Sequence, residues 1–166
     1  DTLRSQRDDL NGRLMGTAAQ AATVAMPVKL AIDYESSMAD VKKVTDFDDA
    51  DFKVFSQDLL EMSTRLPVTA KGLAEIAAAA GAAGIKQDEL LVFSEDAAKM
   101  GVAFDMSAKE AGAAMTDMRT NFKLSQDGVR LLGDSMNALS NTMKAPAAQI
   151  IDFANRTSGT AQTYNL

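Results

Sequence analysis

Two amphipathic helical patterns lie back to back between Gly84 and Phe122, and this stretch limits the possible folds more than any other part of the chain. Each pattern repeats apolar residues at intervals of three and four, which places them on one face of an α-helix. The first runs over about residues 87–102, with Leu90, Leu91, Phe93, Ala97, Met100 and Ala103; the second contains Ala111, Ala114, Met115, Met118 and Phe122. We therefore expect a helical hairpin that closes apolar face to apolar face.

The junction between the two patterns carries a helix start signal. Ser107 stands where a hydroxyl can accept hydrogen bonds from the first free backbone N–H groups, and Glu110 follows three residues later. This spacing is that of a capping box, in which each side chain bonds the backbone of the other residue. The sequence SAKE therefore predicts the first turn of the second helix.

The N-terminal part reads as a long helical segment over residues 1–45, with a break at Pro27. Leucines and then alanines recur at near-heptad spacing between Leu3 and Ala25, which predicts an amphipathic helix or the end of a coiled coil. A proline disfavours helix in the residue before it and is well placed to begin a new helix. We expect that second helix over about residues 28–44, and self-association through the upstream segment.

The acidic sequence from Thr45 to Asp51 has four aspartates in seven residues, as calcium loops do. An EF-hand loop beginning at Asp46 would need a glycine at position 51 and a bidentate glutamate at 57, where this chain has Asp51 and Gln57. We expect instead that these acids cap a connecting helix over about residues 50–65, ended by Pro67, within a 46–68 segment.

The remainder, residues 69–166, reads as repeated helical hairpins. Helix starts at Thr69, Ser107 and Ala145 are evenly spaced along the chain, and IKQD at residues 85–88 matches LSQD at 124–127. The periods are about 69–106, 107–144 and 145–166, the last one incomplete. Stacked hairpins of this length are typical of quasi-linear helical arrays. The fold class expected is all-α: a long N-terminal helix or coiled-coil segment followed by an array of short amphipathic hairpins, elongated rather than compact.

Composition supports a helical body built by close packing. Hydrophobic residues make up 46% of the chain but aromatic residues only 5%, and there are ten methionines. The net charge of −6 argues against a surface that neutralises nucleic-acid phosphates. The longest apolar runs are too short to span a bilayer. Because the chain begins at Asp1 without an initiator methionine, we expect a piece of a longer protein.

The chain has no histidine and no cysteine, which excludes Ser-His-Asp and Cys-His centres and ordinary zinc sites. The adjacent acids Glu95 and Asp96 point about 100° apart on a helix, so we expect a solvated face and not a glycosidase pair. Gly81 and Gly84 lack the strand and lysine of a phosphate loop and are expected to let a short alanine-rich helix end and turn, or to allow close backbone contact. The methionines at 100, 106, 115, 118, 136 and 143 are expected in the core, with a pliable binding groove as the alternative. No cofactor, metal or catalytic residue is expected.

Three stretches resemble phage tail tape measure proteins, most closely those of contractile-tailed phages. They are LAIDYESSMADVKKVT, DELLVFSEDAAKMGVAFDMSAKEAGAAMTDMRTNF and LGDSMNALSNTMKAPAAQIIDFANRTSG, and the likeness covers about residues 28–159. The resemblance implies a structural virion protein whose helices lie in the tail tube, set its length during assembly and leave before the DNA. It also implies contacts with the tube protein, the baseplate hub or tail tip, assembly chaperones and the host envelope. It supplies no catalytic residues.

Two functional hypotheses follow from different classes. The first is a tail component that forms a homo-oligomer, with a trimer as the expected state. The second is a monomeric helical-repeat module that binds a partner helix in a methionine-lined groove. An enzyme is a distant third. The residues expected to serve self-association or packing are Leu10, Leu14, Ala18, Ala21, Ala25, Phe93, Met100, Phe104, Met115 and Met118.

Overall fold

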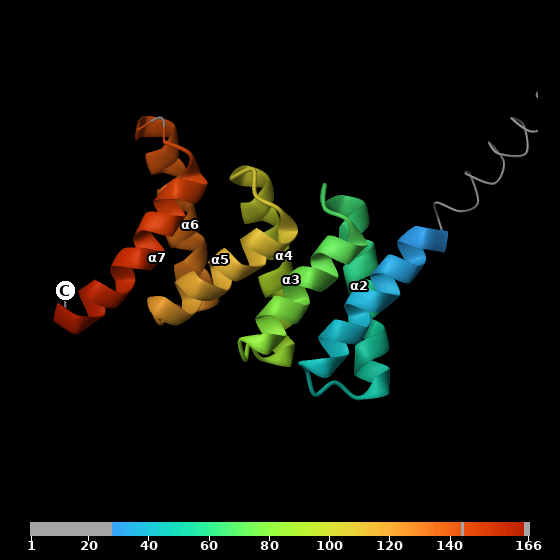
Figure 1. Ribbon diagram of the computed structural model, residues 1–166. Helices are drawn as coiled ribbons and strands as arrows, with labels where there is room; N and C mark the ends of the chain where they lie inside the picture. The colour runs from blue at the N-terminus through green and yellow to red at the C-terminus, as the bar shows by residue number, and fades with distance from the viewer. Residues whose placement is uncertain (1–27, 144, 165–166) are drawn as a thin grey trace, which may run out of the picture. The chain divides into compact units, whose positions relative to one another are not determined.

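The computed structural model describes residues 28–143 and 145–164, and every element within these ranges is a helix (Figure 1). The chain divides into two units, residues 1–36 and 37–166. The described part of the first unit, residues 28–36, is helical, and the second unit contains the core. The expected all-α fold is confirmed for the described residues, whereas the expected elongation stays a prediction. The predicted N-terminal helix or coiled coil up to Ala25 lies outside these residues.

In the part of the chain that the structure describes, six helices come after the one that ends at Lys43. Their bounds are α2 Asp49–Arg65, α3 Ala70–Ala82, α4 Gln87–Ala103, α5 Ala108–Asn121, α6 Gln126–Met143 and α7 Ala147–Tyr164. The starts of α3, α5 and α7 are almost equally spaced, and α4 and α6 begin at the same interval. The observed starts therefore recur at the spacing read from the sequence, while the division of the chain into segments stays a prediction.

Local hydrogen bonds explain where these helices begin. The Ser107 side chain accepts from the backbone N–H of Glu110 at 3.3 Å, and Glu110 Oε2 accepts from the backbone N–H of Ser107 at 2.9 Å. This is the predicted capping box. Thr69 caps α3 through a 3.1 Å bond from Gly72 N, and Asp48 caps α2 by accepting from the two backbone N–H groups at 50 and 51. The prediction that the acidic stretch caps a helix is confirmed.

The turns that follow α3, α4 and α5 share one backbone feature. Gly84, Asp105 and Lys123, which come after α3, α4 and α5, have φ angles of 79°, 54° and 51°. This left-handed conformation ends a helix and costs an L-residue about 1 kcal/mol, but costs glycine nothing. Gly84 thus ends α3 as expected, and the other two turns form at residues with a side chain.

Packing contacts arrange the second unit as two interleaved rows of helices. Helices α3, α5 and α7 contact one another in order, and α2, α4 and α6 do the same, while each helix also contacts its partner in the other row. The contact between α3 and α5 is the most extensive. The core between the rows contains Leu59, Met62, Leu73, Ile76, Leu90, Phe93 and Met118, all with less than 2% of their surface exposed.

Candidate functional site

Several helices of the fold approach one another closely at glycines and alanines. A Cβ atom built on Gly112 of α5 would lie 3.2 Å from the backbone Cα of Ile76 in α3, so these helices meet almost backbone to backbone. Two other glycines come still closer to alanine methyls: the corresponding distance is 3.0 Å from Gly72 to Ala108 and from Gly101 to Ala111. We call these six residues the small-residue seam, because all of them except Ile76 are glycine or alanine. It explains how an alanine-rich chain with few aromatics buries its helices.

The predicted packing residues in the described part of the chain are all buried. Phe93 and Met118 have no exposed surface, Met115 exposes 3%, Met100 6% and Phe104 8%. They are covered within one copy of the chain. The other five, Leu10, Leu14, Ala18, Ala21 and Ala25, lie outside the described residues. Self-association through either set stays a prediction.

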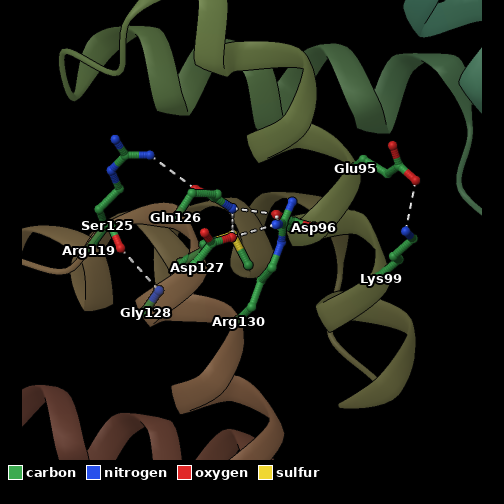
Figure 2. Close-up of polar contacts among 10 residues, drawn as sticks. Glu95, Asp96, Lys99, Arg119, Ser125, Gln126, Asp127, Gly128 and Arg130 are labelled. Carbon is green, nitrogen blue, oxygen red and sulfur yellow. Dashed lines mark hydrogen bonds and ion pairs between the residues drawn. The ribbon is translucent and has the colours of Figure 1, made fainter.

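A polar network joins α4, α5 and α6 beside the core (Figure 2). Asp96 Oδ2 on α4 accepts from Gln126 Nε2 at 2.6 Å and from Arg130 Nε at 2.7 Å, both on α6. Gln126 Oε1 in turn accepts from Arg119 Nη1 at 3.0 Å, and Arg119 is paired with Glu89 at the start of α4. We call these five residues the interhelical clamp. Because charged hydrogen bonds depend strongly on direction, the clamp specifies how α6 sits on the α4–α5 hairpin.

The two adjacent acids on α4 take different partners, as Figure 2 shows. Glu95 pairs with Lys99 one turn along the same helix at 2.8 Å, and the hydrogen bond from Lys99 lowers the pKa of Glu95. The Asp96 side chain is only 11% exposed and turns toward Arg130, whose pKa this carboxylate raises. The expected divergence of the two acids is therefore observed. The expectation of a solvated face is wrong for Asp96, because α6 covers that side of α4.

A groove of about 510 Å³ lies between α4 and α6. Its floor is apolar and its rim carries charged and amide groups; the lining residues include Met100, Phe104, Met115 and Val129 on the floor and Lys99, Arg130, Asp134 and Asn137 on the rim. Gly133 stands at its open side, where an added Cβ would meet no atom within 4 Å. Met100 and Met115 line the groove and are buried, and Met118 and Met136 are buried without lining it. Met106 is half-buried, and the expectation of a core position is wrong for Met143, which is 63% exposed near the end of α6.

The seam is built from apolar contacts and the clamp from hydrogen bonds and ion pairs. Within the described residues, no three histidine, cysteine, aspartate or glutamate side chains gather in a way that could hold a metal ion. In the same ranges, no helix is long and apolar enough to cross a bilayer. The clamp acids are engaged in ion pairs with arginines of neighbouring helices.

The clamp and the seam were not found by sequence reasoning. Glu89 and Arg119 are 30 residues apart, and Asp96 and Arg130 are 34 apart. No local pattern links residues at such separations. The one sequence signal that bears on these pairs is the regular repeat of the hairpins, because it places residues about one repeat apart at corresponding positions of neighbouring helices.

Stacked helical hairpins joined by small residues and by paired charges define an all-helical structural or interaction protein. Comparison with known sequences identifies the family within this class. The sequence pattern of the phage-related minor tail protein family matches residues 56–166, and the chain belongs to this family. Its members are structural proteins of the phage tail, in agreement with the resemblance read from the sequence.

One curated relative carries a more specific description. The chain is 31% identical to the probable tape measure protein of Halomonas phage phiHAP-1, over 98% of this chain. The matched stretch is 20% of that relative, so the chain spans about a fifth of its length. No solved structure matches the chain.

Proposed function

We propose that this chain is a section of a tape measure protein that lies in the tail tube or at its tip, helps to set tail length during assembly, and leaves ahead of the DNA. The match of the tail protein family over residues 56–166 carries the proposal, and the tape measure relative makes it specific. Helices that pack on each other through the small-residue seam suit a protein whose role is to occupy length.

Charge and chain geometry favour the same function. A ruler works when its length grows in proportion to its number of residues, and a helix supplies this at ~1.5 Å per residue. The net charge of −6 disfavours adhesion to DNA that passes the same space. The partners we propose are further copies of the chain, with a trimer as the simplest assembly, the tube protein, the baseplate hub or tail tip, the assembly chaperones and, after ejection, the host envelope.

An in-frame deletion tests the ruler directly. Removing residues 107–144 from the whole protein should shorten the tail, measured by electron microscopy of assembled particles. If the deleted residues lie as one extended helix, the loss is ~57 Å at ~1.5 Å per residue. If they lie as a stacked hairpin, the loss is about 10 Å, which is one interaxial distance. Duplication of the same residues is the matched control and should lengthen the tail equally.

Tails of unchanged length in both the deletion and the duplication would contradict the ruler function. If the deletion alone prevents the tail from assembling, the duplication still tests the ruler function, because it removes no residue of the chain.

The groove between α4 and α6 favours a second candidate, a helical-repeat module that binds a partner helix. Its apolar floor around Met100 and Phe104 suits an amphipathic helix. Light scattering on the purified chain separates the two functions. A stable monomer that binds a helical peptide supports the module, and an oligomer that docks on tube or hub rings supports the tail component.

A further inference from the structure

Helices α4, α5 and α6 share one apolar register that continues through both turns between them. Two series of positions with a step of seven residues, one starting at Leu90 and one at Ser94, run as far as Leu139 and Met143. Thirteen of these sixteen positions hold apolar residues and none holds a charged one, although charged residues make up 24% of the chain. We call these positions the heptad stripe, because their alternating steps of four and three residues are those of a coiled-coil seam.

The stacked hairpins by themselves do not require this common register. Each helix of a hairpin needs an apolar face of its own, but a turn re-aims the chain, so the faces before and after it can start in different registers. Here the register passes unbroken through two turns, and Phe104 and Phe122, which directly follow α4 and α5, both lie on the stripe. The pattern therefore describes a second arrangement of the same residues, a continuous helix.

The backbone between residues 87 and 143 is compatible with a continuous helix. The chain has no proline between Pro67 and Pro146, and the turns after α4 and α5 place Asp105 and Lys123 in the left-handed conformation. A residue with a side chain is relieved of strain when it leaves this conformation for a right-handed helix, whereas a glycine such as Gly84 is not. The two turns after α4 and α5 are therefore the ones suited to opening, and α3 stays outside the continuous helix.

The side chains of the heptad stripe need cover in both arrangements. In the stacked hairpins most of them are buried within one copy, but Leu139 is 43% exposed and Met143 is 63% exposed. The interhelical clamp lies entirely at other heptad positions, so opening the turns buries none of its charges. A continuous helix would expose the stripe along one side, and a helix with the same seven-residue repeat covers such a stripe over its whole length. The same segment in another copy of the chain has this repeat.

We propose that α4, α5 and α6 open at Asp105 and Lys123 into one continuous helix when copies of the chain meet, and that the copies pair through the heptad stripe. The stacked hairpins and the coiled coil are then two packings of one set of apolar residues, the first within a copy and the second between copies. Because association supplies the cover, the population of the open form grows with the concentration of the chain. The proposal rests on the proposed function for its partner, since further copies of the chain belong to that function, but it does not depend on the ruler role.

Spin labels on two introduced cysteines measure the opening directly, because the chain has no cysteine of its own. Asp88→Cys on α4 and Asp127→Cys on α6 lie beside Glu89 and Gln126, which both bond Arg119 in the stacked hairpins. Helices α4 and α6 are in contact there, which puts their axes about 10 Å apart. In a continuous helix, positions 88 and 127 are ~58 Å apart at ~1.5 Å per residue.

Double electron–electron resonance on the 166-residue chain gives the populations of the two distances. We expect the short distance in dilute solution, and a long-distance fraction that grows when the concentration is raised about a hundredfold, with the helical circular dichroism signal retained. Asp105→Gly should lower the long-distance fraction several-fold, because glycine favours the turn and disfavours the helix.

Leu139→Lys and Leu131→Lys form the matched pair of variants. Both leucines are exposed on α6, at 43% and 68%, so neither lysine disturbs the stacked hairpins, but only Leu139 lies on the heptad stripe. Leu139→Lys should remove the long distance, because it puts a charge into the seam between copies, and Leu131→Lys should leave it unchanged.

A short distance at every concentration would overturn the proposal, as would a long distance that survives Leu139→Lys or is lost in Leu131→Lys. A long-distance fraction that does not depend on concentration would also overturn it, because the open helix would then have no partner copy. The same holds for a long distance that appears with loss of the helical signal, which is unfolding. None of these measurements reports tail length, so the ruler function is tested separately by the deletion and the duplication.

Discussion

Replacing Gly112 by alanine sets two effects of similar size against each other. Alanine stabilises a helix interior by about 1 kcal/mol relative to glycine, because glycine loses more backbone freedom on folding. At Gly112, however, the new Cβ would lie 3.2 Å from the Ile76 Cα, and ordinary contact begins at 3.4 Å. The obstacle is helix backbone, which cannot rotate away as a side chain can.

The size of the effect can be estimated from this geometry. Helices α3 and α5 must part by a few tenths of an ångström along their most extensive contact, and overpacking of this kind costs about 1–3 kcal/mol. We therefore expect Gly112→Ala to change the free energy of unfolding by between zero and about −2 kcal/mol. Gly133→Ala is the matched control: it also lies inside a helix, but its added Cβ meets nothing within 4 Å. It should stabilise the protein by about 0.5–1 kcal/mol.

Urea denaturation followed by circular dichroism at the helical band measures both variants, with the m-value as a check that the unfolding transition is unchanged. We expect the free energies of unfolding of the two glycine variants to differ from each other by about 1–3 kcal/mol, with Gly133→Ala the more stable. Equal stabilisation by both substitutions would mean that α3 and α5 do not approach as closely as the seam requires. A larger residue at the same position, in Gly112→Leu, should be markedly destabilising.

Further substitutions test the caps, the core, the clamp and the turns. Ser107→Ala should lower the free energy of unfolding by about 1 kcal/mol in urea titrations through the lost cap. The hydrogen bond from Ser107 lowers the pKa of Glu110, so the stabilisation from that carboxylate is present above the usual glutamate range and is lost as the pH falls through the lowered pKa. The difference between variant and wild type should therefore narrow in acid, while the part due to the bond from the Glu110 backbone N–H remains. Met100→Asp should cost ~3 kcal/mol or more, since it buries an unpaired charge, and an unchanged melting temperature would show that the residue is not in the core. Asp96→Asn should lower the free energy of unfolding by about 1 kcal/mol, a small value because the partner Arg130 is partly exposed to solvent. Native-state hydrogen exchange of the backbone amides should rise in α6 before it rises in α3. Lys123→Gly should raise the midpoint of thermal unfolding, because glycine avoids the cost of about 1 kcal/mol that a left-handed backbone imposes on lysine. A lower midpoint would argue against a left-handed residue in the turn after α5.

Local features of the structure were readable from the sequence because their hydrogen bonds join residues close in the chain. The capping box at Ser107 and Glu110 spans three residues, and the acidic cap at Asp48 spans no more. The apolar stripe of α4 is predicted by helical periodicity alone. Each of these interactions forms within one turn of helix, so its signal is present in a short window of sequence.

The interhelical clamp and the small-residue seam had no such signal. A glycine such as Gly112 has the same local meaning in any helix, and only the approach of Ile76 makes it a contact residue. Likewise, Asp96 belongs to the polar side of its helix by pattern, and it becomes largely buried only because α6 packs there.

The order of residues alone establishes that this protein is helical, where its helices begin and turn, and which face of each is apolar. It also carries the likeness to tape measure proteins, because that likeness lies in the sequence. Packing of the folded chain settled the rest: which faces meet, which acids are paired across helices, and that Leu139 of α6 is left partly exposed. The difference is one of range, since caps and periodicity act over a few residues, whereas pairing between helices depends on the shapes and charges of side chains far apart in the chain.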